Sequence, residues 1–349
     1  MSAACTLLVS RLVWGEHADR LLAIAARHGV RLIPRLADGP HGADGLPTGV
    51  EIAFFSRDLY TGSTMERAGE SSVQFFAAAL ASPVLRWVQL CSSGLDLPDY
   101  RALLSRPGLT LSTGAGTTAR PIAMNVLAAV LGLQRGFGHW LNAQQEGRWA
   151  PFARDALPRD TDGLTAVVVG AGAIGTEVAR LLRAIGMTTI GVRASGAAHP
   201  DFDHVVQQAQ LADVLPSCNW LVLACPLTAQ THRMIAAPQL ALLPPGAGLV
   251  NVGRGGLIDE PDLIKALAVG RPGHAYLDVF ATEPLPADSP LWYLPNVWIT
   301  PHNASASAGH DARLVGIFAD NLDRWLTGRE LINAVSVRIR EAAGEPAAT

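Results

Sequence analysis

The feature that most constrains this chain is the run Val-Val-Val-Gly-Ala-Gly-Ala-Ile-Gly at residues 167–175. Residues 164–169 are almost all apolar, which is typical of a buried strand, and residues 176–185 have the apolar spacing of a helix. A glycine-rich turn that joins a buried strand directly to a helix predicts the first unit of a parallel α/β sheet.

The three glycines of this turn, Gly170, Gly172 and Gly175, have the G-x-G-x-x-G spacing. Such glycines permit a tight turn, a close approach to a pyrophosphate, and close packing of the helix on the strand. The pyrophosphate binds the free amides of the first helical turn, which here include those of Ala173 and Ile174. The turn therefore predicts a dinucleotide site, and the alternative is a turn that serves packing alone.

The end of the next predicted strand, residues 188–192, bears on which dinucleotide binds. In this fold an acidic residue at that point accepts hydrogen bonds from the ribose hydroxyls of NAD. This chain has Arg193 and Ser195 there, and its first carboxylate comes only at Asp201. Because a guanidinium pairs bidentately with a phosphate, we expect NADP(H) to be preferred over NAD(H). The alternative is an exposed loop arginine with no part in binding.

Length and charge limit the remaining possibilities. The chain has 349 residues, which suits two domains, and it is 49% hydrophobic and 16% charged with a net charge of −3. This balance has no basic excess that would indicate a nucleic-acid or membrane partner. The longest uncharged stretch, residues 235–253, contains three prolines and is therefore not expected to span a membrane.

The cysteines and the N-terminus indicate a compartment. The four cysteines are scattered and form no C-x-x-C pair, so we expect neither a disulfide framework nor a metal site. The N-terminus shows no charged region followed by a long apolar stretch, so we expect no signal peptide. Both observations favour a cytoplasmic protein.

Strands and helices are predicted to alternate along both halves of the chain. This pattern predicts an α/β protein with parallel sheets in two Rossmann-like domains. Residues 121–149 contain no internal proline and predict one long helical tract, and the last helix is expected at 308–326. The other predicted elements of the first half are strands at 6–10, 31–34, 50–55, 85–90 and 109–112 and helices at 16–28 and 73–80.

Three polar residues follow apolar segments downstream of the glycines: Arg254, Glu283 and His302. Ligands of open α/β sheets bind at the carboxyl ends of the strands. Reduction of a 2-oxo acid needs this set, because arginine holds a carboxylate, histidine donates a proton, and glutamate orients the histidine and favours its charged form. Each of the three, taken alone, is equally compatible with a structural role.

At this point the sequence resembles the D-isomer-specific 2-hydroxyacid dehydrogenase family, and in particular its glyoxylate/hydroxypyruvate reductase-like members. The resemblance covers nearly the whole chain. It rests on VVVGAGAIG, ACPLT at 224–228, NVGRGGLIDE at 251–260, LDVFATEPLP at 277–286 and TPHNASAS at 300–307.

By position, the resemblance implies that Arg254 binds the substrate, Glu283 is the carboxylate partner and His302 is the acid/base. The implied activity is hydride transfer between NADP(H) and a 2-oxo acid, either glyoxylate- or hydroxypyruvate-like or larger, which yields the D-2-hydroxy acid with His302 as proton donor.

The resemblance also assigns binding residues outside this set. Ser93 and Gly94 match a loop whose backbone amides grip the substrate carboxylate. Asp278 matches a residue that helps to hold the nicotinamide carboxamide, and Cys225 and Pro226 match the cofactor site. The side chain of the substrate is expected to meet residues 55–62 and the segment after His302. In the first of these, Arg57 and Tyr60 either contact a polar or aromatic substituent or only cap the domain.

The domain organisation that the resemblance implies is a split one. Residues 1–116 and 303–349 form the substrate-binding domain, completed by the C-terminal segment, and residues 117–302 form the dinucleotide-binding domain, including the long linking helix. A homodimer built on the dinucleotide domain is implied as well. The chain departs from the family pattern at Ala123-Met124-Asn125, where an acidic residue is usual near the start of that helix.

Two other functions are considered on the same fold. Formate dehydrogenases carry a glutamine where this chain has Glu283, which argues against that activity. A dinucleotide-sensing corepressor, a binding protein of the same fold, retains the catalytic residues, but this chain has no long extra tail for partner motifs. Oxidation of NADPH by a 2-oxo acid distinguishes the enzyme from the sensor.

Overall fold

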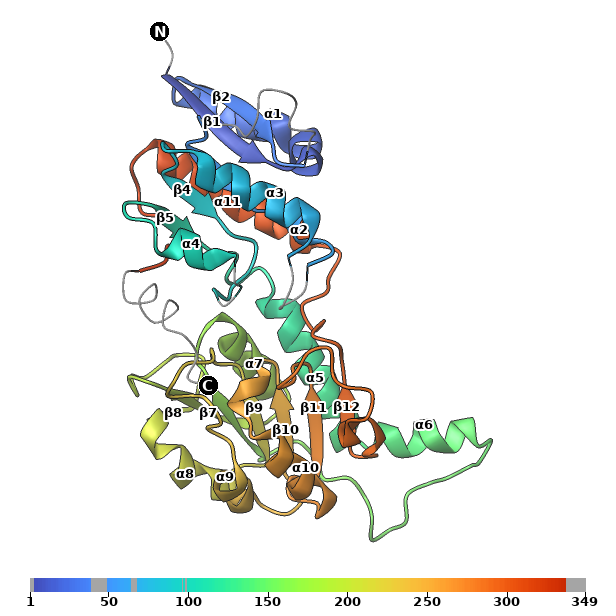
Figure 1. The fold of residues 1–349 in the computed structure, drawn as a ribbon. Coiled ribbons are helices and arrows are strands. Elements are labelled where there is room, and N and C mark those ends of the chain that lie inside the picture. Colours follow the sequence, from blue (N-terminus) through green and yellow to red (C-terminus); the bar gives the residue numbers. More distant parts are fainter. Residues whose placement is uncertain (1–2, 39–48, 64–67, 96, 98, 337–349) are drawn as a thin grey trace. The chain divides into compact units, whose positions relative to one another are not determined.

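The computed structural model describes residues 3–38, 49–63, 68–95, 97 and 99–336. The chain divides into two compact units, residues 1–117 with 308–349 and residues 118–307 (Figure 1). The sequence predicted domain boundaries after residues 116 and 302, and the structure has them after residues 117 and 307. Residues 337–349, which the first predicted domain includes, lie outside the described residues.

Unit 1 is built on a five-stranded parallel sheet in the order β2-β1-β3-β4-β5. The inner strands β1, β3 and β4 are mostly buried, as expected for a parallel sheet covered by helices, whereas the edge strand β2 has only Leu32 buried. Their bounds are β1 (Ala3–Val9), β2 (Val30–Leu36), β3 (Ile52–Phe54), β4 (Trp87–Gln89) and β5 (Thr110–Ser112). The helices of the unit are α1 (Arg11–Arg27), α2 (Arg57–Tyr60), α3 (Glu70–Ala81), α4 (Tyr100–Leu104) and α11 (His310–Leu326).

Helix α11 comes from the C-terminal part of the chain but belongs to the core of unit 1 (Figure 1). Its Phe318 stacks on Phe54 of β3 with the ring centroids 4.3 Å apart, and on Trp87 of β4 at 5.4 Å. Aromatic pairs of this kind contribute about 0.5–1.5 kcal/mol beyond the burial of their area. The first domain is thus completed by the last helix.

Unit 2 is built on a seven-stranded parallel sheet in the order β12-β11-β10-β9-β6-β7-β8. The strand order reverses between β6 and β9, which is where ligands bind in doubly wound folds. The strands are β6 (Thr165–Val169), β7 (Thr188–Arg193), β8 (His204–Gln207), β9 (Trp220–Leu223), β10 (Gly248–Asn251), β11 (His274–Leu277) and β12 (Val297–Ile299). The helices are α5 (Ala119–Gln134), α6 (Phe137–Gln145), α7 (Ala173–Ala184), α8 (Leu211–Val214), α9 (Ala237–Leu242) and α10 (Glu260–Ala268). The two parallel sheets confirm the predicted fold class.

The prediction of one helical tract over residues 121–149 is wrong, because the tract is two helices. Helix α5 ends at Gln134, and Gly136 adopts a left-handed conformation with φ +72° before α6 starts. A left-handed glycine is a common way to end a helix, and a Cβ at Gly136 would lie 2.5 Å from the ring of Phe152. The break is therefore set by backbone conformation and by a contact with a residue 16 positions further on.

The start of the first helix also differs from the prediction. Helix α1 begins at Arg11, five residues before the predicted start, because the Ser10 side chain accepts a hydrogen bond from the Val13 amide at 3.1 Å. Within the part of the chain that the structure describes, no helix has the length and apolar character needed to cross a membrane.

Candidate active site

The glycine turn lies between β6 and α7, as predicted. Gly170 has φ +105°, and a Cβ there would lie 2.7 Å from the Ala224 carbonyl oxygen. A Cβ at Gly175 would lie only 1.8 Å from the Gly170 carbonyl oxygen. Both glycines are therefore required by the packing of the turn itself.

Gly172 is different, because no described protein atom lies within 4 Å of the Cβ position built on it. It caps the N-terminus of α7, and the first turn of that helix contains no acidic side chain. The turn thus offers free amides, the positive end of a helix dipole and an open approach beside Gly172. These features fit a pyrophosphate, so the residues present suit a dinucleotide.

Arg193 is the last residue of β7, next to the carboxyl edge of the sheet. Two arginines of α7 have carboxylate partners after β7: Arg180 pairs with Asp201 at 2.8 Å and Arg183 with Asp203 at 3.2 Å. Among the residues the structure describes, no carboxylate lies within ion-pair distance of Arg193. Because Asp201 forms its ion pair with Arg180, the guanidinium of Arg193 remains available for a phosphate.

Cys225 and Pro226 follow β9, the strand that pairs with β6. They lie beside the glycine turn, because the Ala224 amide donates to the Val169 carbonyl at 2.9 Å. Burial raises the pKa of the Cys225 thiol to about 11, so this side chain is neutral at ordinary pH. Ser195, in contrast, is exposed in the loop after β7.

His302 and Glu283 are in direct contact at the carboxyl edge of the same sheet. The His302 Nδ1 atom lies 2.7 Å from Glu283 Oε2, and Glu283 Oε1 accepts a hydrogen bond from the Phe280 amide at 3.0 Å. The glutamate is thus held at both oxygens. It accepts the Nδ1 proton of the imidazole and leaves the Nε2 side of the ring for a substrate.

The charges of the site act on both partners of this pair. The hydrogen bond to Glu283 raises the pKa of His302, and together with the charges of Glu283 and Asp278 it outweighs the opposing effects of burial and of Arg254. Burial raises the pKa of Glu283, but the His302 and Phe280 hydrogen bonds and the charges of His302 and Arg254 bring it below its usual value. Glu283 is therefore ionised, and it favours a protonated His302.

Arg254 lies just after β10 and before a short turn of 3-10 helix, Gly255–Leu257. Its Nη1 donates to the Gly253 carbonyl at 2.8 Å, and Asn251 Nδ2 donates to the Arg254 carbonyl at 3.0 Å. A Cβ at Gly255 would lie 1.9 Å from the Phe280 backbone. This close approach brings the segment of Arg254 against the segment that carries Glu283.

Asp278 is 4% exposed and holds the turn that carries His302. Its Oδ1 accepts hydrogen bonds from Thr300 Oγ1 at 2.5 Å and from the amides of Asn303 at 2.8 Å and Ala304 at 3.0 Å. Its backbone carbonyl accepts from the His302 amide at 2.8 Å. The predicted contact of Asp278 with a nicotinamide carboxamide stays a prediction, and the structure adds a role in positioning His302.

Three site residues were missed by sequence reasoning. Thr300 hydrogen-bonds both to Asp278 and to the hydroxyl of Tyr276. Asn251 donates to the Arg254 carbonyl and so stabilises the loop of that arginine. Asn125 donates to the Ala304 carbonyl at 2.8 Å. The signal for Asn251 was its position three residues before Arg254, since asparagine side chains bond nearby backbone groups. Asn125 belongs to the segment 123–125, the region near the start of the helix where the family usually carries an acidic residue, and here it supports the turn that carries His302.

The other predicted substrate residues belong to unit 1. Ser93 and Gly94 follow β4, and Ser92 Oγ donates to the Gly94 carbonyl at 2.7 Å. Arg57 begins α2, where its Nη1 lies 3.3 Å from His310 Nδ1. Arg57 thus contacts α11 within its own unit, and the predicted choice between a substrate contact and a role in capping the domain stays open.

Comparisons with known proteins agree with this geometry. Residues 127–304 match the family model described as D-isomer specific 2-hydroxyacid dehydrogenase, NAD binding domain. The chain is 32% identical over 262 residues to glyoxylate/hydroxypyruvate reductase B of Pectobacterium atrosepticum, a match that covers 74% of this chain and 81% of the relative.

Two solved structures share the fold over nearly their whole length. A D-isomer specific 2-hydroxyacid dehydrogenase family protein from Aeromonas salmonicida has a TM-score of 0.74 and 30% identity, covering 97% of this chain and 100% of that one. A D-isomer specific 2-hydroxyacid dehydrogenase from Xanthobacter autotrophicus Py2, in complex with NADPH and MES, has a TM-score of 0.74 and 28% identity, covering 97% and 99%.

The fold and the site together define a dinucleotide-dependent α/β oxidoreductase. The chain belongs to the D-isomer specific 2-hydroxyacid dehydrogenase family, as its motifs predicted. It is an NAD(P)-dependent D-2-hydroxyacid dehydrogenase. Among the described residues, no group of three or more histidine, cysteine, aspartate or glutamate side chains is placed to hold a metal ion.

Proposed function

We propose that this protein uses NADPH to reduce a small 2-oxo acid, of the glyoxylate or hydroxypyruvate type or larger, to the D-2-hydroxy acid. The observation that carries the proposal is the 2.7 Å contact between His302 and Glu283 on the sheet edge that also carries Arg254 and the glycine turn. The name of the Pectobacterium relative supports the substrate class.

The residues of the chain have separate tasks in this reaction. A bound nicotinamide supplies the hydride. Arg254 holds the substrate carboxylate and polarises the neighbouring carbonyl as negative charge develops on its oxygen. His302 donates its Nε2 proton to that oxygen, and Glu283 keeps the ring oriented and charged before the transfer.

NADPH as the preferred cofactor is supported by two observations. Arg193 stands where an acidic residue would select NAD, and the Asp201 carboxylate is paired with Arg180. The Xanthobacter structure was solved with NADPH bound. We assign Arg193 to the 2′-phosphate, with Ser195 beside it in sequence.

The experiment that tests the proposal follows NADPH absorbance as 2-oxo acids of increasing size are added to the purified protein. Glyoxylate or hydroxypyruvate should be turned over, and His302→Ala should lower kcat by about 10²–10⁴ while NADPH binding is nearly unchanged. If NADPH binds but no 2-oxo acid oxidises it, the reductase is excluded and the dinucleotide sensor is favoured. Ser93 and Gly94 stay predicted carboxylate ligands, and Gly94→Ala should then raise KM for every active acid.

We propose in addition that the protein is a homodimer assembled through unit 2. This unit exposes apolar side chains on and after α6: Phe137, Trp140, Leu141 and Trp149, the last of which is 96% exposed. An exposed apolar cluster of this kind is typical of an interface. Sedimentation should give a dimer, and replacement of Trp140 and Leu141 by serine should produce monomer. A wild type that sediments as a monomer at assay concentration contradicts this proposal.

A further inference from the structure

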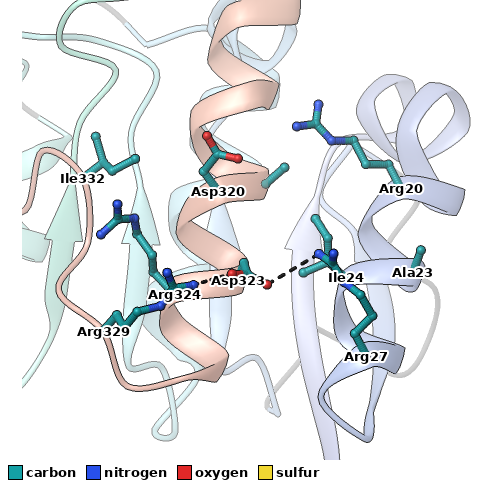
Figure 2. A pocket seen from close by; sticks show the side chains of 10 residues that line it. Arg20, Ala23, Ile24, Arg27, Asp320, Asp323, Arg324, Arg329 and Ile332 are labelled. Atoms are coloured by element: carbon teal, nitrogen blue, oxygen red, sulfur yellow. Dashed lines mark hydrogen bonds and ion pairs between the residues drawn. The ribbon is translucent and has the colours of Figure 1, made fainter.

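Unit 1 contains a charged cavity that no part of the proposed reaction uses. It has a volume of about 570 Å³ and lies between α1, α11 and the segment that follows α11 (Figure 2). Ile24, 7% exposed, and Ala319, fully buried, form an apolar part of its wall. Its charged lining residues are Arg20, Arg27, Arg324, Arg329, Asp320 and Asp323.

One of the two aspartates is already paired. Asp323 accepts a hydrogen bond from His28 Nε2 at 2.8 Å, forms an ion pair with Arg329, and lies 3.5 Å from Arg27 Nη2. The His28 hydrogen bond, followed by that from Arg329, lowers the pKa of Asp323. This carboxylate therefore stays charged and joins α1 to α11, and it neutralises only part of the arginine charge.

Two of the arginines have no carboxylate partner within the described part of the chain. Arg324 Nη1 donates to the Glu330 carbonyl at 3.0 Å, which leaves its positive charge uncompensated. Arg20 extends from α1 toward α11 (Figure 2), and no hydrogen bond or ion pair from its guanidinium to a described residue is found. Both guanidinium groups retain donors that match the oxygens of an anion.

Asp320 adds a carboxylate to the same wall of the cavity. It lies one helical turn before Arg324 on α11, so the two side chains share a face of that helix. No cation lies within ion-pair distance of Asp320 among the described residues. A carboxylate that has no described cation partner, beside two guanidinium groups that have no described carboxylate partner, suits a molecule that presents anionic oxygens and also a hydroxyl donor.

We infer that this cavity binds a small organic dianion that carries hydroxyl groups. The four arginines exceed the two aspartates by two positive charges, which matches a dianion. Arg20 and Arg324 bind its oxygens, and Asp320 accepts from a hydroxyl. A phosphate monoester and a dicarboxylate share this chemistry, and the two are separated by the probes used below.

Binding here has a structural consequence, because the cavity walls come from opposite ends of the chain. Arg20 lies on α1, and Arg324 lies on α11 about 300 residues later. A dianion that bridges them adds to the Asp323 contacts and stabilises the closure of unit 1 by the C-terminal helix. By mass action, a ligand that binds only the folded state raises the melting temperature by an amount that grows with the logarithm of its concentration once that concentration exceeds Kd.

The test is thermal unfolding of the full chain with increasing glycerol phosphate, inorganic phosphate or succinate, with ionic strength held constant by sodium chloride. Wild type should show a rise in Tm of a few degrees with at least one of these probes, and the rise should grow with the logarithm of probe concentration above Kd. Replacement of Arg20 and Arg324 by glutamine should raise the apparent Kd about tenfold or more, since each removes a charged hydrogen bond. Asp320→Asn should tighten binding of inorganic phosphate, because it removes a repulsive charge.

Three controls make the outcome decisive. Arg101→Gln removes an exposed arginine elsewhere in unit 1 and should keep the wild-type rise. Arg254→Ala disables the proposed substrate site and should keep the wild-type rise in Tm as well. Arg20→Gln alone is the test variant if the double variant unfolds, because the Arg20 side chain forms no hydrogen bond or ion pair with a described residue and its loss should disturb the fold least. The proposal is overturned if the rise survives the loss of Arg20 and Arg324, disappears in Arg254→Ala, or is absent from wild type with all three probes.

Discussion

The His302 Nδ1 atom donates to Glu283 Oε2 at 2.7 Å, while the backbone amide of the same histidine donates to the Asp278 carbonyl at 2.8 Å. His302 also has φ +50°, a conformation that is uncommon outside glycine, although asparagine, aspartate and histidine adopt it more often than other residues. The imidazole ring of His302 is thus held by Glu283, and its backbone is held by Asp278. This arrangement determines which imidazole nitrogen faces a substrate, as general acid catalysis requires.

The first prediction concerns the pH dependence of reduction. Reduction needs protonated His302, and the hydrogen bond and charge of Glu283 raise its pKa. The raised pKa extends activity to higher pH, so Glu283→Gln should move the alkaline limb of kcat/KM for reduction toward lower pH. The measurement is a pH profile for each variant with one active 2-oxo acid.

Glu260→Gln is a matched control for this experiment. Glu260 Oε2 accepts a hydrogen bond from the Ala281 amide at 3.1 Å, and it does not contribute to the pKa shift of His302. Its replacement should leave the profile unchanged. A Glu283→Gln profile that overlays wild type shows that Glu283 does not set the protonation of His302.

The second prediction separates two glycines of the same turn. Gly175→Ala places a Cβ 1.8 Å from the Gly170 carbonyl oxygen, so it should lower Tm markedly. Gly172→Ala places its Cβ in open space, so Tm should stay close to that of wild type. The added methyl group should instead obstruct the approach of the pyrophosphate and weaken NADPH binding. Calorimetry and NADPH titration test both variants, and unchanged binding in Gly172→Ala contradicts the assigned cofactor position.

The contrast between the glycine turn and the His302 turn shows what can be predicted from the sequence. The glycine turn is local, because strand, turn and helix are set by neighbouring residues, and its position was predicted well. The role of Asp278 depends on residues 22 to 26 positions away, namely Thr300, Asn303 and Ala304. Periodicity and spacing contain no information on such contacts. The partnership of Glu283 with His302 was predicted from the chemistry of 2-oxo acid reduction and from the family motifs, and the break at Gly136 was hidden in an otherwise helical pattern.

The third prediction concerns cofactor choice. Arg193→Ala should weaken NADPH binding by about ten- to a hundredfold and leave NADH nearly unchanged, because a charged hydrogen bond contributes about 1.5–3 kcal/mol. Binding titrations with both cofactors measure the ratio. Lys265→Ala removes an exposed cation of the same unit, whose side chain is 78% exposed, and should change neither affinity. Equal losses for both cofactors in Arg193→Ala, or a wild type that prefers NADH, exclude the 2′-phosphate contact.

The last prediction concerns Arg254, for which the structure supports two roles. Its Nη1 donates to the Gly253 carbonyl at 2.8 Å, so one role is to stabilise the loop after β10. The other is to anchor the substrate carboxylate beside His302. Arg254→Lys keeps the positive charge but loses the planar fork, so it tests which role dominates.

If Arg254 anchors the substrate, Arg254→Lys should raise KM and lower kcat together, and Arg254→Ala should lower kcat/KM further. Tm should change little in Arg254→Lys, because the loop retains the Asn251 contacts to Gly253 and to the Arg254 backbone. Steady-state kinetics and thermal unfolding on the same preparations separate the two roles. An Arg254→Lys protein that melts far below wild type, yet turns over 2-oxo acids normally in its folded fraction, shows that the arginine stabilises the loop and does not bind substrate.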